Sequence, residues 1–241
     1  MSDSPTQASN EMTGQLDKYG VRYMLREFST TILNIVLLLI AAGTVQWLNA
    51  WLFTGLILAY QVATMIALAR LNPALLNKRG KLVQETTKFF DKVFVASYIP
   101  LAFTIPVVAG LDAIRFQWSV ICLGLNIVGC VLFVMACVFG LWAMIVNQHF
   151  EMTVFIDKQA QQVCSSGPYS IIRHPGYAAE ILALLSTPLI LNSWFSYLPV
   201  GGLVLLFIIR TALEDKTLQQ ELPSYRDYTQ RTRYRLIPHI W

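Results

Sequence analysis

Two polar stretches in the C-terminal half of the chain contain residue types that can bind a charged ligand. The first is GPYSIIRHPGY, residues 167–177, in which Arg173 and His174 stand between prolines and tyrosines. Each proline fixes its own φ and disfavours the helical region for the residue before it, so this stretch is expected to form a shaped loop. Gly176 then precedes an apolar segment, whose first amide N–H groups would be free to face an electron-rich ligand.

The second stretch is RTALEDKTL, residues 210–218. On a helix, Arg210 and Glu214 would share a face because they are four residues apart, and the same holds for Thr211 and Asp215. An acid and a base on one face favour either a ligand site or an ordinary surface ion pair. The sequence of this segment alone leaves both interpretations open.

The elements that must position these residues are membrane helices. Hydrophobic residues make up 55% of the 241 residues and charged residues 13%, and the mean hydropathy is +0.52. Such a composition is typical of a protein embedded in a bilayer, and alternating strands of the kind found in barrels are absent from the sequence. We therefore predict an all-α, polytopic integral membrane bundle with about six membrane segments, at residues 28–46, 50–70, 93–111, 117–146, 177–192 and 195–213.

The last two apolar segments are joined only by Asn-Ser-Trp at residues 192–194, which predicts a tight helical hairpin. This hairpin would return residues 210–218 to the membrane surface that holds residues 173–177. Basic residues set the orientation, because Lys and Arg are retained on the cytosolic side. The loop 70–92 is rich in them, whereas the opposite side of this arrangement exposes only Arg115. Both termini and the polar loop 147–176 are therefore expected on the cytosolic face.

Three regions follow from this pattern. Residues 1–27 are expected to be a flexible polar tail, and residues 28–146 four membrane helices with the basic cytosolic loop 70–92. Residues 147–241 would hold the site, and their end mixes tyrosines with arginines as in a helix that lies on an anionic leaflet. Because this basic tail adjoins membrane segments, we interpret it as facing lipid rather than nucleic acid.

Other chemistries lack their usual signatures. The four cysteines, Cys122, Cys130, Cys137 and Cys164, follow no metal-binding spacing, so neither a metal nor a disulfide is expected. Phosphate-binding glycine loops and nucleophile elbows are also absent from the sequence. Glu180 is unusual because it falls about one turn inside the fifth segment, where an acid is costly unless it is paired or wetted. It would serve either a substrate or a structural pair.

The stretch GPYSIIRHPGY, followed by RTALEDKTLQQELPSYRDYTQRTRYRLIP, resembles the isoprenylcysteine carboxyl methyltransferase family, which is related to the phospholipid N-methyltransferases. The resemblance covers about residues 147–241. It implies S-adenosylmethionine as cofactor, held in a cytosol-facing pocket, and a lipophilic or amphiphilic acceptor that arrives from the membrane lipids. The cofactor-binding residues that it implies are Gln161, Gln162, Val163, Cys164, Tyr169, His174, Pro175, Gly176, Tyr177 and Glu214.

The resemblance also assigns two arginines to catalysis. It implies that Arg210 faces the substrate and that Arg173 organises the site, and Glu180 is a further candidate for substrate binding. If the acceptor is a carboxylate, Arg210 can hold it through two parallel hydrogen bonds. Methyl transfer mainly requires alignment of donor and acceptor, which suits a site with no metal or covalent nucleophile.

Several alternatives remain open at this point. The acceptor is a carboxylate in the family most resembled, but an amine or a thiol is possible; these would need a base, for which Glu180, His149 or His174 are candidates. A membrane reductase of the sterol-reductase type, binding NADPH, would use arginines such as Arg231, Arg233 and Arg235 for the extra phosphate. A non-catalytic membrane scaffold with a solvated polar mouth is the third alternative.

Overall fold

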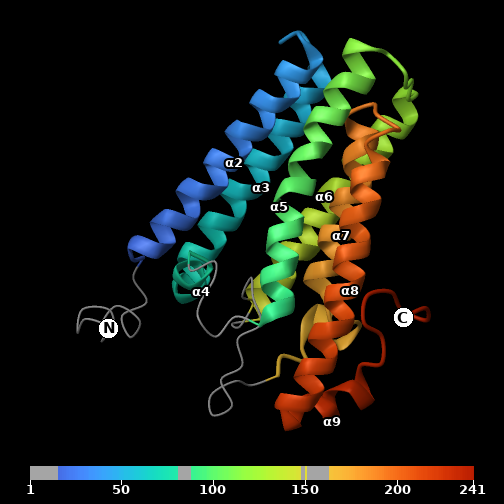
Figure 1. Ribbon diagram of the computed structural model, residues 1–241. Helices are drawn as coiled ribbons and strands as arrows, with labels where there is room; N and C mark the ends of the chain where they lie inside the picture. The colour runs from blue at the N-terminus through green and yellow to red at the C-terminus, as the bar shows by residue number, and fades with distance from the viewer. Residues whose placement is uncertain (1–15, 81–87, 148–149, 151–162) are drawn as a thin grey trace.

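The computed structural model describes residues 16–80, 88–147, 150 and 163–241, and these residues form a helical bundle (Figure 1). Within these ranges the only β-type pairing is an isolated bridge between Ile172 and Tyr234. The elements are α2 (Lys18–Ala42), α3 (Leu48–Leu71), α4 (Pro73–Arg79), α5 (Phe89–Gly110) continued by the π-helix η1 (Leu111–Arg115), α6 (Leu123–Val146), the 3₁₀ turn η2 (Gly167–Ser170), α7 (Pro175–Ile190), α8 (Tyr197–Glu221) and α9 (Pro223–Arg231).

Five of these helices, α2, α3, α5 with η1, α6 and α8, are long and apolar enough to cross a membrane. The prediction of an all-helical membrane bundle is confirmed, and the sixth expected segment is the shorter apolar helix α7. With its 16 residues, α7 is about 24 Å long, somewhat less than the hydrocarbon core of a bilayer. The hairpin is also present, because α8 begins seven positions after the end of α7 and runs back antiparallel to it.

The first helix begins earlier than the sequence analysis expected. It starts at Lys18, so residues 18–27 are helical and do not belong to a flexible tail. Asp17 provides the physical reason, because its side chain accepts hydrogen bonds from the backbone N–H groups of Tyr19 and Gly20 at 2.7 and 3.0 Å. This is an N-cap, a local signal that hydropathy alone does not detect.

Small residues allow close helix crossings in two places. A Cβ added to Gly110 of α5 would lie 2.6 Å from the backbone oxygen of Leu38 on α2. A Cβ added to Gly129 of α6 would lie 2.6 Å from the Cβ of Leu189 on α7. Close backbone approach at small residues is the usual way in which helices associate inside a membrane.

A buried carboxylate fixes the end of the bundle where α7 turns into α8. Asp112 of η1 is fully buried, and it accepts hydrogen bonds from the hydroxyls of Ser119 and Ser193 at 2.7 and 2.6 Å. The backbone N–H of Phe195 donates a third bond at 3.1 Å. These donors offset part of the cost of a buried acid, and they tie the end of the α5 segment to the turn of the hairpin.

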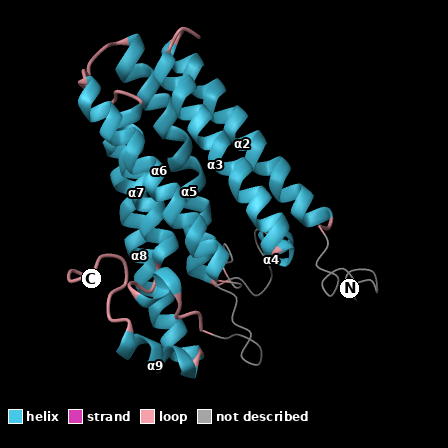
Figure 2. Ribbon diagram, turned by 180° about the vertical axis from the view of Figure 1, so that it is seen from behind, coloured by secondary structure: helices cyan, strands magenta, loops and turns pink. Residues whose placement is uncertain are grey.

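The helices spread apart toward the opposite end. Both ribbon views show α2 and α3 as a pair that leans away from α5, α7 and α8 at the end that carries the start of α2, α4, α9 and the C-terminus (Figures 1 and 2). The loop before α7 and the end of α8 lie at this end too. The fold thus brings the two polar stretches of the sequence to the wide end of the bundle.

Candidate active site

The loop before α7 is held by the C-terminal tail. Gly167 adopts a positive φ of 56°, a conformation that favours glycine, and the turn η2 follows it. The backbone N–H groups of Arg173 and His174 then donate to the carbonyl oxygens of Tyr234 and Arg235, both at 2.9 Å. The two segments therefore run side by side, and the tail fixes the backbone of the residues that enter α7.

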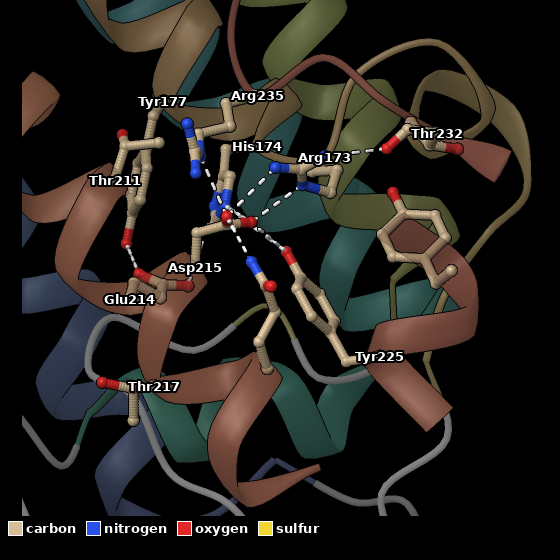
Figure 3. Close-up of polar contacts among 12 residues, drawn as sticks. Arg173, His174, Tyr177, Thr211, Glu214, Asp215, Thr217, Tyr225, Thr232 and Arg235 are labelled. Carbon is tan, nitrogen blue, oxygen red and sulfur yellow. Dashed lines mark hydrogen bonds and ion pairs between the residues drawn. The ribbon is translucent and has the colours of Figure 1, made fainter. Parts of the chain in front are cut away.

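Asp215 of α8 is the centre of the polar network at this site (Figure 3). Its side chain is fully buried, and its carboxylate accepts hydrogen bonds from Nε and Nη2 of Arg173 at 2.8 and 3.0 Å. Nε of Arg235 and Nε2 of Gln219 reach the same carboxylate at 2.9 and 2.8 Å, and the hydroxyl of Tyr225 donates to it at 3.0 Å. One buried acid thus binds two arginines and a tyrosine, which come from the loop before α7, the C-terminal tail and α9. Asp215 therefore links these three segments to α8.

Glu214, the neighbouring acid, lies in a different environment. The hydroxyl of Tyr177 donates to its Oε2 at 2.5 Å, and Nδ1 of His174 lies 3.9 Å from its Oε1. The rings of His174 and Tyr177 are parallel within 3°, with centroids 5.7 Å apart. The Glu214 side chain remains 17% exposed. Its carboxylate therefore keeps acceptor capacity for a ligand, whereas that of Asp215 is used by the protein.

A cavity of about 680 Å³ starts between these groups and extends into the membrane part of the bundle. It follows α7 from Pro175 to Leu191, a length of about 24 Å. The cavity brings together all the described residues that the sequence analysis assigned to the site: Val163, Cys164, Tyr169, Arg173, His174, Pro175, Gly176, Tyr177, Glu180, Arg210 and Glu214. Gln161, Gln162 and His149 lie outside the residues that the structure describes.

The sequence analysis missed the contribution of α9. Tyr225 and Tyr228 were expected on a helix lying against the leaflet, but each is only 5% exposed and lines the cavity. The hydroxyl of Tyr228 donates to the carbonyl oxygen of Tyr169 at 2.7 Å. Burial raises the pKa of Tyr228, and burial together with the Asp215 carboxylate raises the pKa of Tyr225. Both phenols therefore stay protonated and act as donors. The spacing of Leu222, Tyr225 and Tyr228 was the available signal, because it marks one helix face.

Arg210 has a different partner from the one that the sequence suggested. Its Nη2 lies 2.9 Å from Oδ1 of Asp91 on α5, and its guanidinium stacks over the rings of Phe94 and Tyr177 at 4.3 and 5.2 Å. The nearest acid is thus not Glu214 on the same helix, and the pair is buried between α5 and α8 rather than on a helix surface. The charge of Arg210 is already balanced by Asp91, a residue that sequence reasoning did not single out.

The N-terminal helices supply a second set of residues that the sequence analysis missed. In α2, polar side chains recur at helical spacing on the face that lines the cavity: Tyr23, Arg26, Glu27, Thr30, Thr31 and Asn34. In α3, the corresponding residues are Tyr60, Gln61 and Thr64. Such a polar stripe in an otherwise apolar helix was visible in the sequence.

No group of three or more His, Cys, Asp or Glu side chains within the described ranges is arranged to hold a metal ion. The four cysteines are free thiols. The groups that face the cavity are carboxylates, phenols, an imidazole and guanidinium groups, which suit an organic ligand with separate charged and aromatic parts.

The chain is similar to known proteins in part of its sequence and in its fold. Residues 125–224, from α6 to the start of α9, match the family model described as phospholipid methyltransferase. No curated protein sequence matches the chain. Among solved structures, the eukaryotic intramembrane Ras methyltransferase (isoprenylcysteine carboxyl methyltransferase) is similar, with a TM-score of 0.53 and 19% identity over 89% of this chain and 75% of that chain.

The matched region contains α7, α8 and the pair formed by Arg173 and Asp215, so it covers most of the site described above, whereas Tyr225 and Arg235 lie beyond it. The likeness to the solved structure shows that the remaining helices follow the same fold. The resemblance on which the sequence analysis relied is thereby confirmed. The chain is an integral membrane methyltransferase, in which residues 125–224 match the phospholipid methyltransferase model and the fold is similar to that of the isoprenylcysteine carboxyl methyltransferase.

Proposed function

We propose that the protein transfers a methyl group from S-adenosylmethionine to an amphiphilic acceptor that enters from the lipid bilayer. One observation carries this proposal: a single cavity joins Glu214 and the tyrosines at the wide end of the bundle to Leu191 at the far end of α7. A donor held at the wide end and an apolar acceptor held along α7 would therefore share one space.

The residues at the wide end fit the proposed cofactor. Glu214 has a carboxylate with spare acceptor capacity, which suits the ammonium or the sulfonium group. The rings of Tyr169, Tyr177, Tyr225 and Tyr228 border the same space and supply faces for an adenine and for cation–π attraction. When bound, S-adenosylmethionine supplies an electrophilic methyl group: the acceptor's lone pair forms the new bond to carbon while the carbon–sulfur bond breaks and leaves its electron pair on sulfur.

The protein's own residues position and shield this chemistry. Arg173 and Asp215 hold the entry to α7 against α8, and Tyr177 orients Glu214 through its hydroxyl. His174 and Arg173 are only 6% and 7% exposed, so these two side chains are shielded from bulk water. In-line methyl transfer depends mainly on the alignment of donor and acceptor, which a rigid network of this kind supports.

The distribution of basic residues supports a cytosolic site. Arg70, at the end of α3, Lys78 and Arg79 of α4, and Lys88 and Lys92 at the start of α5 are at the same end as the site. Among the described parts of the connections at the other end, the basic residue is Arg115. The positive-inside rule therefore favours a wide end, and both termini, in the cytosol.

The reductase alternative gains no support. Arg231, Arg233 and Arg235, which would bind the additional phosphate of NADPH, are not among the described residues that line the cavity. Arg235 is instead engaged with Asp215 and lies 5.1 Å over the ring of Trp241. We therefore propose no second function.

The experiment is a methyl-transfer screen on the purified, membrane-reconstituted protein. Incubation with S-adenosylmethionine carrying a radiolabelled methyl group and fractionated lipid extracts should label a lipophilic product. Glu214→Gln should reduce labelling strongly, whereas Glu221→Gln, which removes a surface carboxylate paired with Lys88, should not. Consumption of NADPH with no methyl incorporation from any extract would contradict the proposal.

A further inference from the structure

The C-terminal tail, residues 232–241, ends in a closed turn with exposed apolar side chains. The backbone N–H groups of Ile240 and Trp241 both donate to the carbonyl oxygen of Ile237, at 3.2 and 3.1 Å. Ile237 is 52% exposed and Ile240 is 76% exposed, whereas Leu236, just before the turn, is buried. Exposed apolar side chains gathered on one turn are typical of a contact with another molecule or with a membrane.

The turn lies at the level where the apolar part of α8 ends. The exposed apolar surface of α8 continues through Ile209 to Leu213, and polar residues follow from Glu214 onward. Arg235 donates to Asp215, two positions after Leu213, which places the tail beside this boundary. In both ribbon views the tail runs back from α9 and ends on the side of the bundle opposite α2 and α3, about level with α4 (Figures 1 and 2). The apolar turn therefore reaches the boundary between lipid and water.

Basic side chains border the same turn. Arg231 and Arg233 precede it and are exposed, and the sequence of residues 232–241 contains no aspartate or glutamate. An acidic soluble partner would suit the arginines and leave the isoleucines in water, whereas a neutral lipid surface would suit the isoleucines alone. An anionic leaflet complements both, because its headgroups attract arginine and its acyl chains accept the apolar side chains.

The turn is held in shape before any contact with lipid. His239 adopts a positive φ of 64°, which is uncommon for a residue other than glycine. Its Nδ1 lies 3.0 Å from the hydroxyl of Tyr234, and the two rings are in contact with centroids 5.0 Å apart. Docking of this turn would therefore order little additional backbone, which lowers the entropic cost of binding.

A short series of contacts joins the turn to the candidate active site. The carbonyl oxygen of Trp241 accepts the backbone N–H groups of Arg235 and Leu236, at 2.7 and 3.1 Å, and the Arg235 guanidinium lies 5.1 Å over the Trp241 ring. Arg235 also donates to Asp215 at 2.9 Å, and its carbonyl oxygen accepts the N–H of His174 at 2.9 Å. Any contact that fixes the turn therefore also fixes the backbone at the entry to α7.

From these observations we infer that the turn at residues 237–240 docks on an anionic lipid surface, and that the lipid thereby holds Arg235 in the position that fixes the loop before α7. The tail is then a positioning segment of the site with its outer contact in the membrane. The inference goes beyond the proposed function, because it concerns how the membrane shapes the site and not which ligand the site holds. The tail also lies outside the region that matches the methyltransferase family model.

The test measures hydrogen–deuterium exchange of the purified full-length protein in nanodiscs, by mass spectrometry of peptides that cover residues 170–176 and 232–241. Nanodiscs of phosphatidylcholine are compared with nanodiscs of equal parts phosphatidylcholine and phosphatidylglycerol. We expect both peptides to exchange at least about fivefold more slowly with the anionic lipid, which is the effect of one arginine at such a surface. Arg233→Gln should lower this ratio about fivefold. Arg226→Gln, at an exposed position of α9 outside the tail, is the matched control and should leave the ratio unchanged.

Equal exchange in the two lipids would overturn the inference, and so would a lipid effect that Arg233→Gln leaves intact. Combined Ile237→Ser and Ile240→Ser substitutions test the apolar part and should speed the exchange of both peptides in either lipid. Unaltered exchange of residues 170–176 in that variant would show that the turn does not hold the loop. The lipid comparison on the unaltered protein decides the matter even if the double variant does not fold.

Titration of the same nanodiscs with S-adenosylmethionine separates this inference from the proposed function. Slower exchange in anionic lipid without cofactor binding would leave the inference standing and reject the proposed function. Cofactor binding without any effect of lipid on exchange would do the reverse.

Discussion

The guanidinium of Arg173 donates two parallel hydrogen bonds to the carboxylate of Asp215, from Nε to Oδ1 at 2.8 Å and from Nη2 to Oδ2 at 3.0 Å. The two residues are 42 positions apart in the sequence. This forked geometry is specific to arginine. The Asp215 side chain in the pair is fully buried. This contact fixes the loop before α7 to the end of α8, and with it the spacing between His174 and Glu214.

Replacing Asp215 with asparagine should destabilise the protein strongly. Arg173 would lose its counter-charge in a buried position, which typically costs about 3–5 kcal/mol. The change should appear as a clearly lower thermal unfolding midpoint in detergent. Asp227→Asn, at an exposed position of α9, is the matched control and should have little effect. A midpoint unaltered by Asp215→Asn would show that this network does not hold the site together.

Because Arg210 and Asp91 form a buried ion pair, we expect the effects of substituting them on stability to be coupled. Because each charge is buried and balanced by the other, Arg210→Met and Asp91→Leu should each destabilise the protein, and the double variant should be less destabilised than the sum. Unfolding midpoints of the four proteins measure this coupling. If Arg210→Met instead lowered turnover at an unaltered midpoint, the arginine would act on the acceptor, as the family resemblance implies.

Alkaline pH should destabilise the site end of the protein. Burial raises the pKa of Tyr228, and burial with the Asp215 carboxylate raises the pKa of Tyr225, so the folded state holds both protons more tightly than the unfolded state does. Their contribution to stability is complete below the ordinary tyrosine pKa of about 10 and is lost as the pH rises above it. Unfolding midpoints measured from pH 7 to 11 should fall only at the alkaline end.

Tyr228→Phe is the variant that tests this explanation. Its midpoint should be lower at neutral pH, because the hydrogen bond to the carbonyl oxygen of Tyr169 is lost, at a cost of about 1 kcal/mol. Its further decline above pH 10 should be shallower than that of the unaltered protein. An equally steep decline would assign the alkaline transition to other groups.

Glycine substitutions test the helix crossings. Gly129→Ala places a Cβ 2.6 Å from that of Leu189, so it should force α6 and α7 apart and cost about 1–3 kcal/mol. Gly55→Ala on α3 is the matched control, because no atom lies within 4 Å of its added Cβ. It should be neutral or slightly stabilising, owing to the better helix propensity of alanine. A similar loss at both positions, seen in the unfolding midpoint, would argue against the close crossing.

Local patterns predicted much of the fold and part of the site. Apolar runs located the membrane helices, and Pro175 with the short turn at residues 192–194 located the hairpin that brings Glu214 near His174. These features depend on nearby residues, which is why the sequence was sufficient. The contact between Arg210 and Asp91 was beyond such reasoning, because it joins two helices whose relative rotation is set by packing.

Other parts of the site were missed although a signal existed. Tyr225 and Tyr228 were grouped with the basic residues of the tail by composition, whereas their spacing places them on one buried face of α9. The polar stripe on α2 was masked by the high hydropathy of the helix as a whole. In both cases periodicity within an element was more informative than its average character.

The most direct test of the account is a calorimetric titration of the purified protein with S-adenosylmethionine. We predict saturable binding at one site per chain, weakened about tenfold or more by Glu214→Gln, which removes the cavity carboxylate next to Tyr177 and His174, and unchanged by Glu221→Gln. Absence of binding, or binding that Glu214→Gln does not weaken, would contradict the claim that the cavity between α7, α8 and α9 holds the methyl donor.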